Sequence, residues 1–195
     1  MEKIILATGN ENKLREIRQI MDGCDVQIVS MKEAGVFEEI EETGTSFEEN
    51  AVIKAKTIAA KTGLLTLADD SGLEIDFLDK APGIYSSRFM GEDTPYSEKN
   101  KAILEKLSGV PDEKRTARFV CAVAAVKPDG TYETVRATME GIIAHKSAGE
   151  NGFGYDPIFF LPEYNLTSAE ISPEEKNAIS HRGKAFRMMR DKLFG

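Results

Sequence analysis

Hydrophobic and polar residues follow two different patterns along this chain. Short runs of apolar and β-branched residues predict strands, and longer segments with apolar residues at helical spacing predict helices. The predicted strands span residues 3–7, 25–29, 64–69, 73–77, 117–126, 132–143 and 158–161. The predicted helices span residues 11–21, 45–63 and 94–109, and two more begin near residues 172 and 180, the last ending near residue 193.

Local signals mark the ends of several of these elements. Thr45 and Ser46 are each followed three residues later by a Glu, which is the capping-box spacing, and Gly63 follows as a helix stop. Pro95 is predicted to occupy the first position of the next helix. Strands and helices alternate at first and a long hairpin follows. This order predicts an α/β fold with a mixed sheet, in a single domain over residues 1–195 with two lobes.

Composition and charge narrow the class of protein. The 195 residues carry a formal net charge of −8, which argues against non-specific binding to nucleic acid. No apolar stretch approaches the length of a membrane span, and the N-terminus lacks the pattern of a signal peptide. Cys24 and Cys121 lie far apart in apolar segments. These features favour reduced cysteines, a cytoplasmic protein and no zinc site.

The most informative feature is a pair of adjacent carboxylates, Asp69 and Asp70. They follow the apolar run 64–68 and precede Ser71-Gly72. We therefore expect a buried strand that ends in two acids and turns at the glycine, at the edge of a sheet where ligands bind. Two carboxylates side by side are costly unless a cation or a proton lies between them, and Mg²⁺ prefers oxygen ligands. The alternative is that they cap a turn or a helix.

A second candidate site joins the first predicted strand to the first helix. Thr8, Gly9 and Asn10 form a turn at a helix N-terminus, which presents free N–H groups to a phosphate, and Lys13 adds a positive charge one turn later. The alternative is an ordinary junction capped by an asparagine. Lys54, in the second helix, could face the same site or lie in solvent.

Two further segments could bind a planar ligand. Gly152 and Gly154 flank Phe153, and either this ring or that of Tyr155 could stack on a base, unless these aromatics fill the core. Asp156 offers an acceptor in the same loop. The segment 180–184 places cations at a helix N-terminus, against the helix dipole, which suggests a functional role.

Taken together and in this order, these segments resemble the inosine triphosphate pyrophosphatase family, which hydrolyses non-standard purine nucleoside triphosphates. The matches extend over nearly the whole chain. The matching segments are Ala7-Thr8-Gly9-Asn10 with Lys13, Glu41-Glu42-Thr43-Gly44, Phe47-Glu48-Glu49-Asn50-Ala51 with Lys54, Leu67-Ala68-Asp69-Asp70-Ser71-Gly72-Leu73, Ala81-Pro82-Gly83-Ile84-Tyr85-Ser86-Ser87-Arg88, Gly152-Phe153-Gly154-Tyr155-Asp156-Pro157 and Ser180-His181-Arg182-Gly183-Lys184-Ala185.

The resemblance implies a long twisted mixed β-sheet flanked by helices, with the nucleotide in a cleft between two lobes. It also implies hydrolysis of ITP, dITP and XTP to the monophosphate and pyrophosphate, with Mg²⁺, in a cytoplasmic homodimer. The expected partner is thus a purine nucleoside triphosphate, with no nucleic acid and no membrane.

The resemblance also assigns roles to individual residues. Asp70 would be the general base, and the expected metal residues are Glu41, Asp70 and Asp69. Glu41 is preferred to Glu42 because of its spacing from Gly44. The expected triphosphate-binding residues are Thr8, Gly9, Asn10, Lys13, Lys54 and Ser71. The expected base-binding residues are Phe153, Gly154, Tyr155, Asp156, Lys176, His181 and Arg182.

Two other functions fit parts of the pattern. A pyrophosphatase of the related Maf-like type would act on modified or pyrimidine nucleotides, but the Phe153 and His181-Arg182 segments favour a purine. A regulatory module that binds nucleotide without turnover would not need the acid pair beside Glu41.

Donors from His181 and Arg182 would favour the 6-oxo group of inosine and xanthosine over the amino group of adenine.

Overall fold

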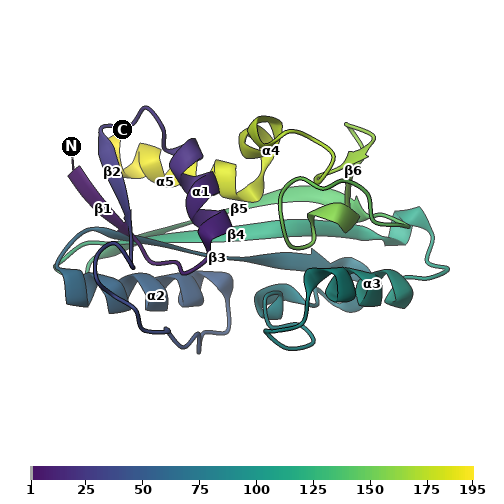
Figure 1. Ribbon diagram of the computed structural model, residues 1–195, viewed down its shortest axis with the longest axis horizontal. Coiled ribbons are helices and arrows are strands. Elements are labelled where there is room, and N and C mark those ends of the chain that lie inside the picture. Colours follow the sequence, from purple (N-terminus) through teal and green to yellow (C-terminus); the bar gives the residue numbers. More distant parts are fainter. Residues whose placement is uncertain (1) are drawn as a thin grey trace. The chain divides into compact units, whose positions relative to one another are not determined.

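The computed structural model describes residues 2–195, and its strands form one mixed sheet (Figure 1). The sheet has seven strands in the order β2-β1-β3-β4-β5-β6-β7. β1 is parallel to β2 and β3, whereas β6 is antiparallel to β5 and β7. The strands are β1 (Glu2–Leu6), β2 (Val26–Ser30), β3 (Thr66–Ile75), β4 (Thr116–Val126), β5 (Tyr132–Ile143), β6 (Phe159–Leu161) and β7 (Leu166–Thr167).

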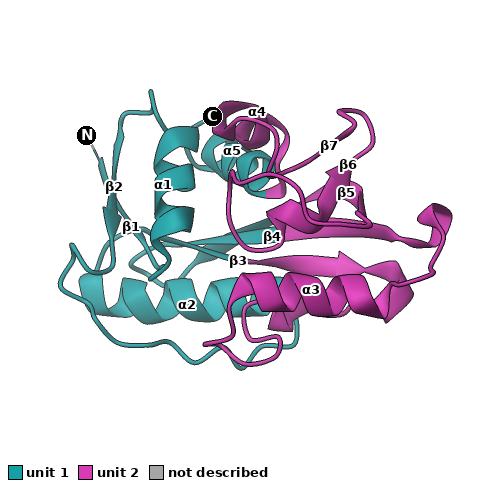
Figure 2. Cartoon of the chain, turned by 45° about the vertical axis from the view of Figure 1, so that its right-hand side comes forward, with its two compact units in different colours: residues 1–70, 121–137, 182–195 teal, residues 71–120, 138–181 magenta. Residues whose placement is uncertain are grey.

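The chain divides into two compact units, shown in different colours in Figure 2. Unit 1 comprises residues 1–70, 121–137 and 182–195, and unit 2 comprises residues 71–120 and 138–181. β3, β4 and β5 each contribute residues to both units. The helices are α1 (Glu11–Ile20), α2 (Phe47–Thr62), α3 (Tyr96–Lys106), α4 (Pro173–Ile179) and α5 (His181–Phe194). An α/β fold with a mixed sheet and flanking helices is therefore confirmed.

Unit 1 has helices on both faces of its strands. α1 and α5 lie on one face and α2 lies on the other, as Figure 1 shows. The alternation of side chains along a strand explains this division. Leu67 packs in the cluster with α1 and α5, and the next residue, Ala68, packs in the cluster with α2.

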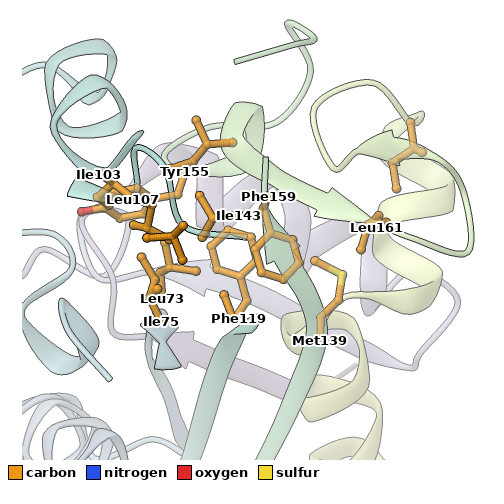
Figure 3. Close-up of a cluster of buried hydrophobic side chains, with 14 residues drawn as sticks. Leu73, Ile75, Ile103, Leu107, Phe119, Met139, Ile143, Tyr155, Phe159 and Leu161 are labelled. Carbon is orange, nitrogen blue, oxygen red and sulfur yellow. The ribbon is translucent and has the colours of Figure 1, made fainter. Parts of the chain in front are cut away.

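Unit 2 has its own hydrophobic core, which Figure 3 shows in close-up. α3 contributes Ile103 to this core, and Leu107, directly after the helix, lies in the same core. The rings of Phe119 and Phe159, from β4 and β6, lie 4.4 Å apart between their centres. Tyr155 is buried in the same cluster, so its ring is part of the core.

Most helix ends follow the local signals in the sequence. Ser46 caps α2 by accepting a hydrogen bond from the backbone N–H of Glu49, and Gly63 ends this helix in the left-handed conformation. Ser172 and Glu175 form a reciprocal capping box at the start of α4. α3 differs, because Pro95 has an extended backbone and precedes the helix instead of forming its first residue.

One sequence prediction about the sheet is wrong. The predicted break at Ser71-Gly72 does not occur, because β3 continues from Thr66 to Ile75. Asp69 and Asp70 therefore lie in the middle of a strand, and not at its end. β1, by contrast, pairs with β3 only as far as Leu6 and Leu67, so the two acids lie just past the end of β1.

None of the helices in the described part of the chain is long and apolar enough to cross a membrane. Both cysteines, Cys24 and Cys121, are free thiols.

Candidate active site

The two acids of β3 point to opposite faces of the strand. Asp69 contacts Lys13 of α1, whereas Asp70 contacts Lys54 of α2. The predicted cation between the two carboxylates stays a prediction, but each of them pairs here with its own lysine. Alternation along an extended strand is the physical reason, since successive side chains leave it on opposite sides.

Asp69 is a fully buried anion held by two cations. Its Oδ2 atom lies 3.0 Å from Lys13 Nζ and 3.5 Å from Arg182 Nη2. Burial alone would raise the pKa of this carboxyl, but the charges of Lys13 and Arg182 outweigh it and lower the pKa far below its ordinary value. Asp69 is therefore ionised at neutral pH, and its position suits a residue that orients other groups.

Arg182 connects Asp69 to a third residue, Glu16. The Nη1 atom of Arg182 lies 2.6 Å from Glu16 Oε2, and its side chain is only 3% exposed. Burial lowers the pKa of the guanidinium, but Asp69 and Glu16 raise it by more, so the charge is retained. These carboxylates explain how a cation is tolerated at the start of α5, against the helix dipole.

Asp70 has a different environment on the other face. It accepts hydrogen bonds of 3.2 Å from Asn50 and from Lys54, which are one turn apart on α2. Burial raises the pKa of the Asp70 carboxyl above its ordinary value, and although Lys54 and Lys13 oppose this rise they do not cancel it. Asp70 is thus a stronger base than an exposed aspartate.

The segment before α2 also reaches this side of the strand. Glu42 lies 2.6 Å from Lys54 Nζ, and the Gly44 N–H donates to Asn50 Oδ1 at 2.8 Å. A Cβ atom at Gly44 would lie 2.7 Å from that oxygen, so the close approach requires glycine. Glu41, in contrast, is exposed.

The loop between β1 and α1 is ordered by its own side chains. Asn10 caps α1 by accepting hydrogen bonds from the N–H groups of Asn12 and Lys13, and Thr8 Oγ1 accepts one from the Asn10 N–H. The junction is therefore capped by an asparagine, Asn10, as the alternative interpretation predicted. Gly9 and Asn10 are exposed, so the loop is also open to a ligand.

The glycine-rich loop of unit 2 is arranged around Asp156. The carboxylate accepts hydrogen bonds from the Phe153 N–H at 2.9 Å, from Lys176 Nζ at 2.6 Å and from Ser168 Oγ at 2.7 Å. It is 2% exposed. Asp156 is thus placed to fix the loop, and Phe153, half-buried beneath Lys176, is the aromatic residue outside the core.

The remaining predicted base-binding residues of unit 2 lie near or within its core. The hydroxyl of Tyr155 donates to the Ser86 carbonyl at 2.6 Å. The ring of His181 stacks on that of Phe119, with centres 4.9 Å apart, and the residue is 5% exposed. Ser71, at the start of unit 2, is half-buried on β3.

Comparison with known proteins decides the family. A model of the Ham1 family matches residues 4–192. The chain belongs to the Ham1 family. This confirms the resemblance inferred from the motifs.

Relatives of this Ham1 chain are similar over almost their whole length. A dITP/XTP pyrophosphatase of Desulforamulus reducens is 48% identical, covering 95% of this chain and 92% of the relative. A HAM1 protein of known structure from Coxiella burnetii is 42% identical with a TM-score of 0.90, covering 99% of this chain and 98% of that one. A nucleoside-triphosphatase / dITP/XTP pyrophosphatase from Mycobacterium abscessus is 43% identical with a TM-score of 0.76, covering 96% of this chain and 98% of that one.

Sequence reasoning missed three residues that contact the candidate site residues. Glu16 lies beside the apolar stripe of α1, and nothing in the local pattern shows that its partner is Arg182. Asn50 belongs to a matching motif, but it was not given a role. Ser168 lies in a stretch with no recognisable motif.

We predict that Asp69→Asn makes the Ham1 fold less stable at neutral pH by about 3 kcal/mol, because Lys13 and Arg182 lose their counter-charge. The folded-state pKa of Asp69 lies below the unfolded value of about 3.9, so the unfolded state binds more protons in acid. The stabilisation is present above that value and is lost as the pH falls. The difference in unfolding free energy between parent and variant should therefore shrink between about pH 5 and pH 2.

Urea unfolding at a series of pH values, followed by circular dichroism, would measure this difference. Asp93→Asn, at an exposed aspartate, is the control and should match the parent throughout. If the difference in unfolding free energy between parent and Asp69→Asn stayed constant with pH, the lowered pKa of Asp69 in the folded state would be contradicted.

Proposed function

We propose that this chain hydrolyses ITP, dITP and XTP to the monophosphate and pyrophosphate, which removes these nucleotides before they enter DNA or RNA. The observation that carries the proposal is the environment of Asp70, a buried carboxylate of raised pKa held by Asn50 and Lys54. Membership of the Ham1 family and the names of its similar relatives support the same reaction.

Asp70 is the proposed general base. It would take a proton from a water molecule that attacks the α-phosphorus, and the bond from that phosphorus to the bridging oxygen would break to release pyrophosphate. The hydrogen bonds from Asn50 and Lys54 fix the orientation of the carboxylate before the reaction. Pre-positioned groups of this kind supply much of the rate enhancement in such displacements.

The triphosphate would be held by two lysines and by donors of the β1–α1 loop and β3. Lys13 and Lys54 are only 16% and 12% exposed, so their charges act in a medium that screens them less than water does. They would stabilise the charge that develops on the leaving pyrophosphate. Hydrogen-bond donors from the β1–α1 loop and β3 complete the proposed set, which is Thr8, Gly9, Asn10 and Ser71.

The proposed metal ion is Mg²⁺, and Asp70 would supply a carboxylate ligand. Mg²⁺ is usually held by one or two carboxylates together with water and substrate phosphates, and the side chains near Asp70 offer hard oxygen atoms. We assign Glu41 and Asp70 to the metal, Glu41 on the basis of its spacing from Gly44 in the matching motif, and Glu41 is exposed. When bound, Mg²⁺ would neutralise phosphate charge. Asp69 would support the site by holding Lys13 in place.

The base would be recognised by the glycine-rich loop and its neighbours. Phe153 would stack on the purine, with its backbone fixed by Asp156. Lys176 and His181 lie in the same unit and would contribute donors toward the 6-oxo group. Arg182, a guanidinium that carries only N–H donors, would also contribute to recognition of the base. Adenine would present an amino group to these donors and be rejected.

A homodimer and a cytoplasmic location belong to the proposal on the strength of the family resemblance alone.

Pyrophosphate release from a panel of nucleotides tests the proposed function. We expect rapid release from ITP, dITP and XTP with Mg²⁺, much slower release from ATP, GTP and dTTP, and no release when EDTA replaces the metal. Release from dTTP or from modified nucleotides instead would indicate a Maf-like pyrophosphatase. Binding of ITP without release would indicate a nucleotide sensor.

Asp70→Asn should lower kcat for ITP by at least about 100-fold while nucleotide binding is retained, because the amide cannot accept the proton. Pyrophosphate release and equilibrium ITP binding would be measured on the same preparation. Asp93→Asn serves as the control for removal of a carboxylate. Near-parental kcat in Asp70→Asn would exclude Asp70 as the base.

Glu41→Gln should raise the Mg²⁺ concentration needed for half-maximal activity by about tenfold or more, because a carboxylate ligand is lost. Glu42→Gln, the same change at the neighbouring residue, is the control. It removes a partner of Lys54 and should change KM for ITP more than the requirement for Mg²⁺. Mg²⁺ titrations of both variants would measure this, and the reverse pattern would assign the metal to Glu42.

A further inference from the structure

Helix α3 buries two polar side chains in its first turns, and both donate to backbone carbonyls. Asn100 is 4% exposed and its Nδ2 donates to the Gly154 carbonyl at 3.1 Å. Lys99 is 1% exposed and its Nζ donates to the Ser87 carbonyl at 2.6 Å. Burying a polar group costs free energy unless it forms a hydrogen bond, and these two hydrogen bonds offset that cost.

The carbonyl held by Asn100 belongs to the proposed base-binding loop. Gly154 has a φ of +66°, and a Cβ atom there would lie 3.6 Å from the ring of Tyr96, another residue of α3. The Tyr96 ring also meets Tyr155 edge-on, with centres 5.1 Å apart. α3 thus contacts the loop on the C-terminal side of Phe153.

The loop is therefore fixed on both sides of its stacking residue. Asp156 binds the N–H of Phe153, and Asn100 binds the carbonyl of the next residue, Gly154. The orientation of the Asn100 amide is determined by this contact, because the opposite orientation would place its oxygen against the carbonyl oxygen. Among the described residues, Asn100 Oδ1 has no hydrogen-bond partner. The hydrogen bond of this side chain is therefore the one that Nδ2 donates to the Gly154 carbonyl.

We propose that Asn100 is a positioning residue for base recognition, which acts by holding the Gly154 carbonyl and so setting the orientation of Phe153. The inference rests on the proposed function, since it assumes that this loop binds the base. Loss of the contact should weaken binding of the nucleobase and leave binding of the phosphates unchanged, because Lys13 and Lys54 belong to unit 1.

Asn100→Asp tests this role through pH. Protonated, the new carboxyl group can donate to the Gly154 carbonyl as the amide does, whereas the ionised form repels it. The ratio of KM for ITP in the variant to that in the parent should rise with pH as this carboxyl ionises. It should reach about tenfold or more once the carboxyl is ionised, in line with a buried carbonyl left without a donor. kcat should change less than KM at every pH.

Three comparisons make the result specific. Asn100→Leu removes the donor altogether, so its KM ratio should be raised at every pH; this variant carries the test if Asn100→Asp fails to fold. Asn151→Asp is the matched control. Asn151 also donates to a backbone carbonyl, that of Ile171, but Asn151 is exposed, so the KM ratio of this variant should not vary with pH. Inorganic tripolyphosphate, which has no base, should inhibit the parent and all variants equally.

The outcomes separate the two proposals. Parental KM values for ITP in both Asn100 variants would overturn the positioning role, as would a matching loss of tripolyphosphate inhibition, which would indicate general damage. A parent protein that releases no pyrophosphate from ITP would overturn the proposed function and this inference with it.

Discussion

The burial of two adjacent carboxylates in one strand constrains the whole of unit 1. Because β3 is extended through Asp69 and Asp70, one carboxylate faces α1 and α5 and the other faces α2. An unpaired buried carboxylate is very unfavourable, so the helix on each face must bring a cation to it. Lys13, Arg182 and Lys54 meet this requirement, and each therefore fixes the helix that carries it against the strand.

The same arrangement separates the chemistry of the two acids. Asp69 is completely buried between Lys13 and Arg182, so its charge is stabilised and its pKa falls. Asp70 shares Lys54 with Glu42, so the effect of burial prevails and its pKa rises. Neighbouring titratable groups with opposite shifts are typical of sites in which one holds the structure and the other reacts. In this chain the residue suited to react is Asp70.

The sequence predicted features that depend on local interactions and failed where distant residues decide. The ends of α2 and the capping box of α4 follow from neighbouring residues, and both were predicted. The turn expected at Gly72 does not form, since a strand in the middle of a sheet continues wherever its neighbours offer pairing partners. Likewise Glu16 could not be found, because Arg182 lies 166 residues further along the chain.

The glycine-rich loop shows a subtler difference between motif and structure. Its glycines suggested a backbone that a ligand approaches closely, but a Cβ atom at Gly152 would lie 2.1 Å from the Asp156 carboxylate. Gly152 is therefore required by the packing of the loop on its own aspartate. Because Phe153 N–H, Lys176 and Ser168 all bind that aspartate, the loop has a fixed shape before any ligand arrives. A preformed stacking residue binds a base at a lower entropic cost than a mobile one, so the aspartate can influence recognition without contacting the base.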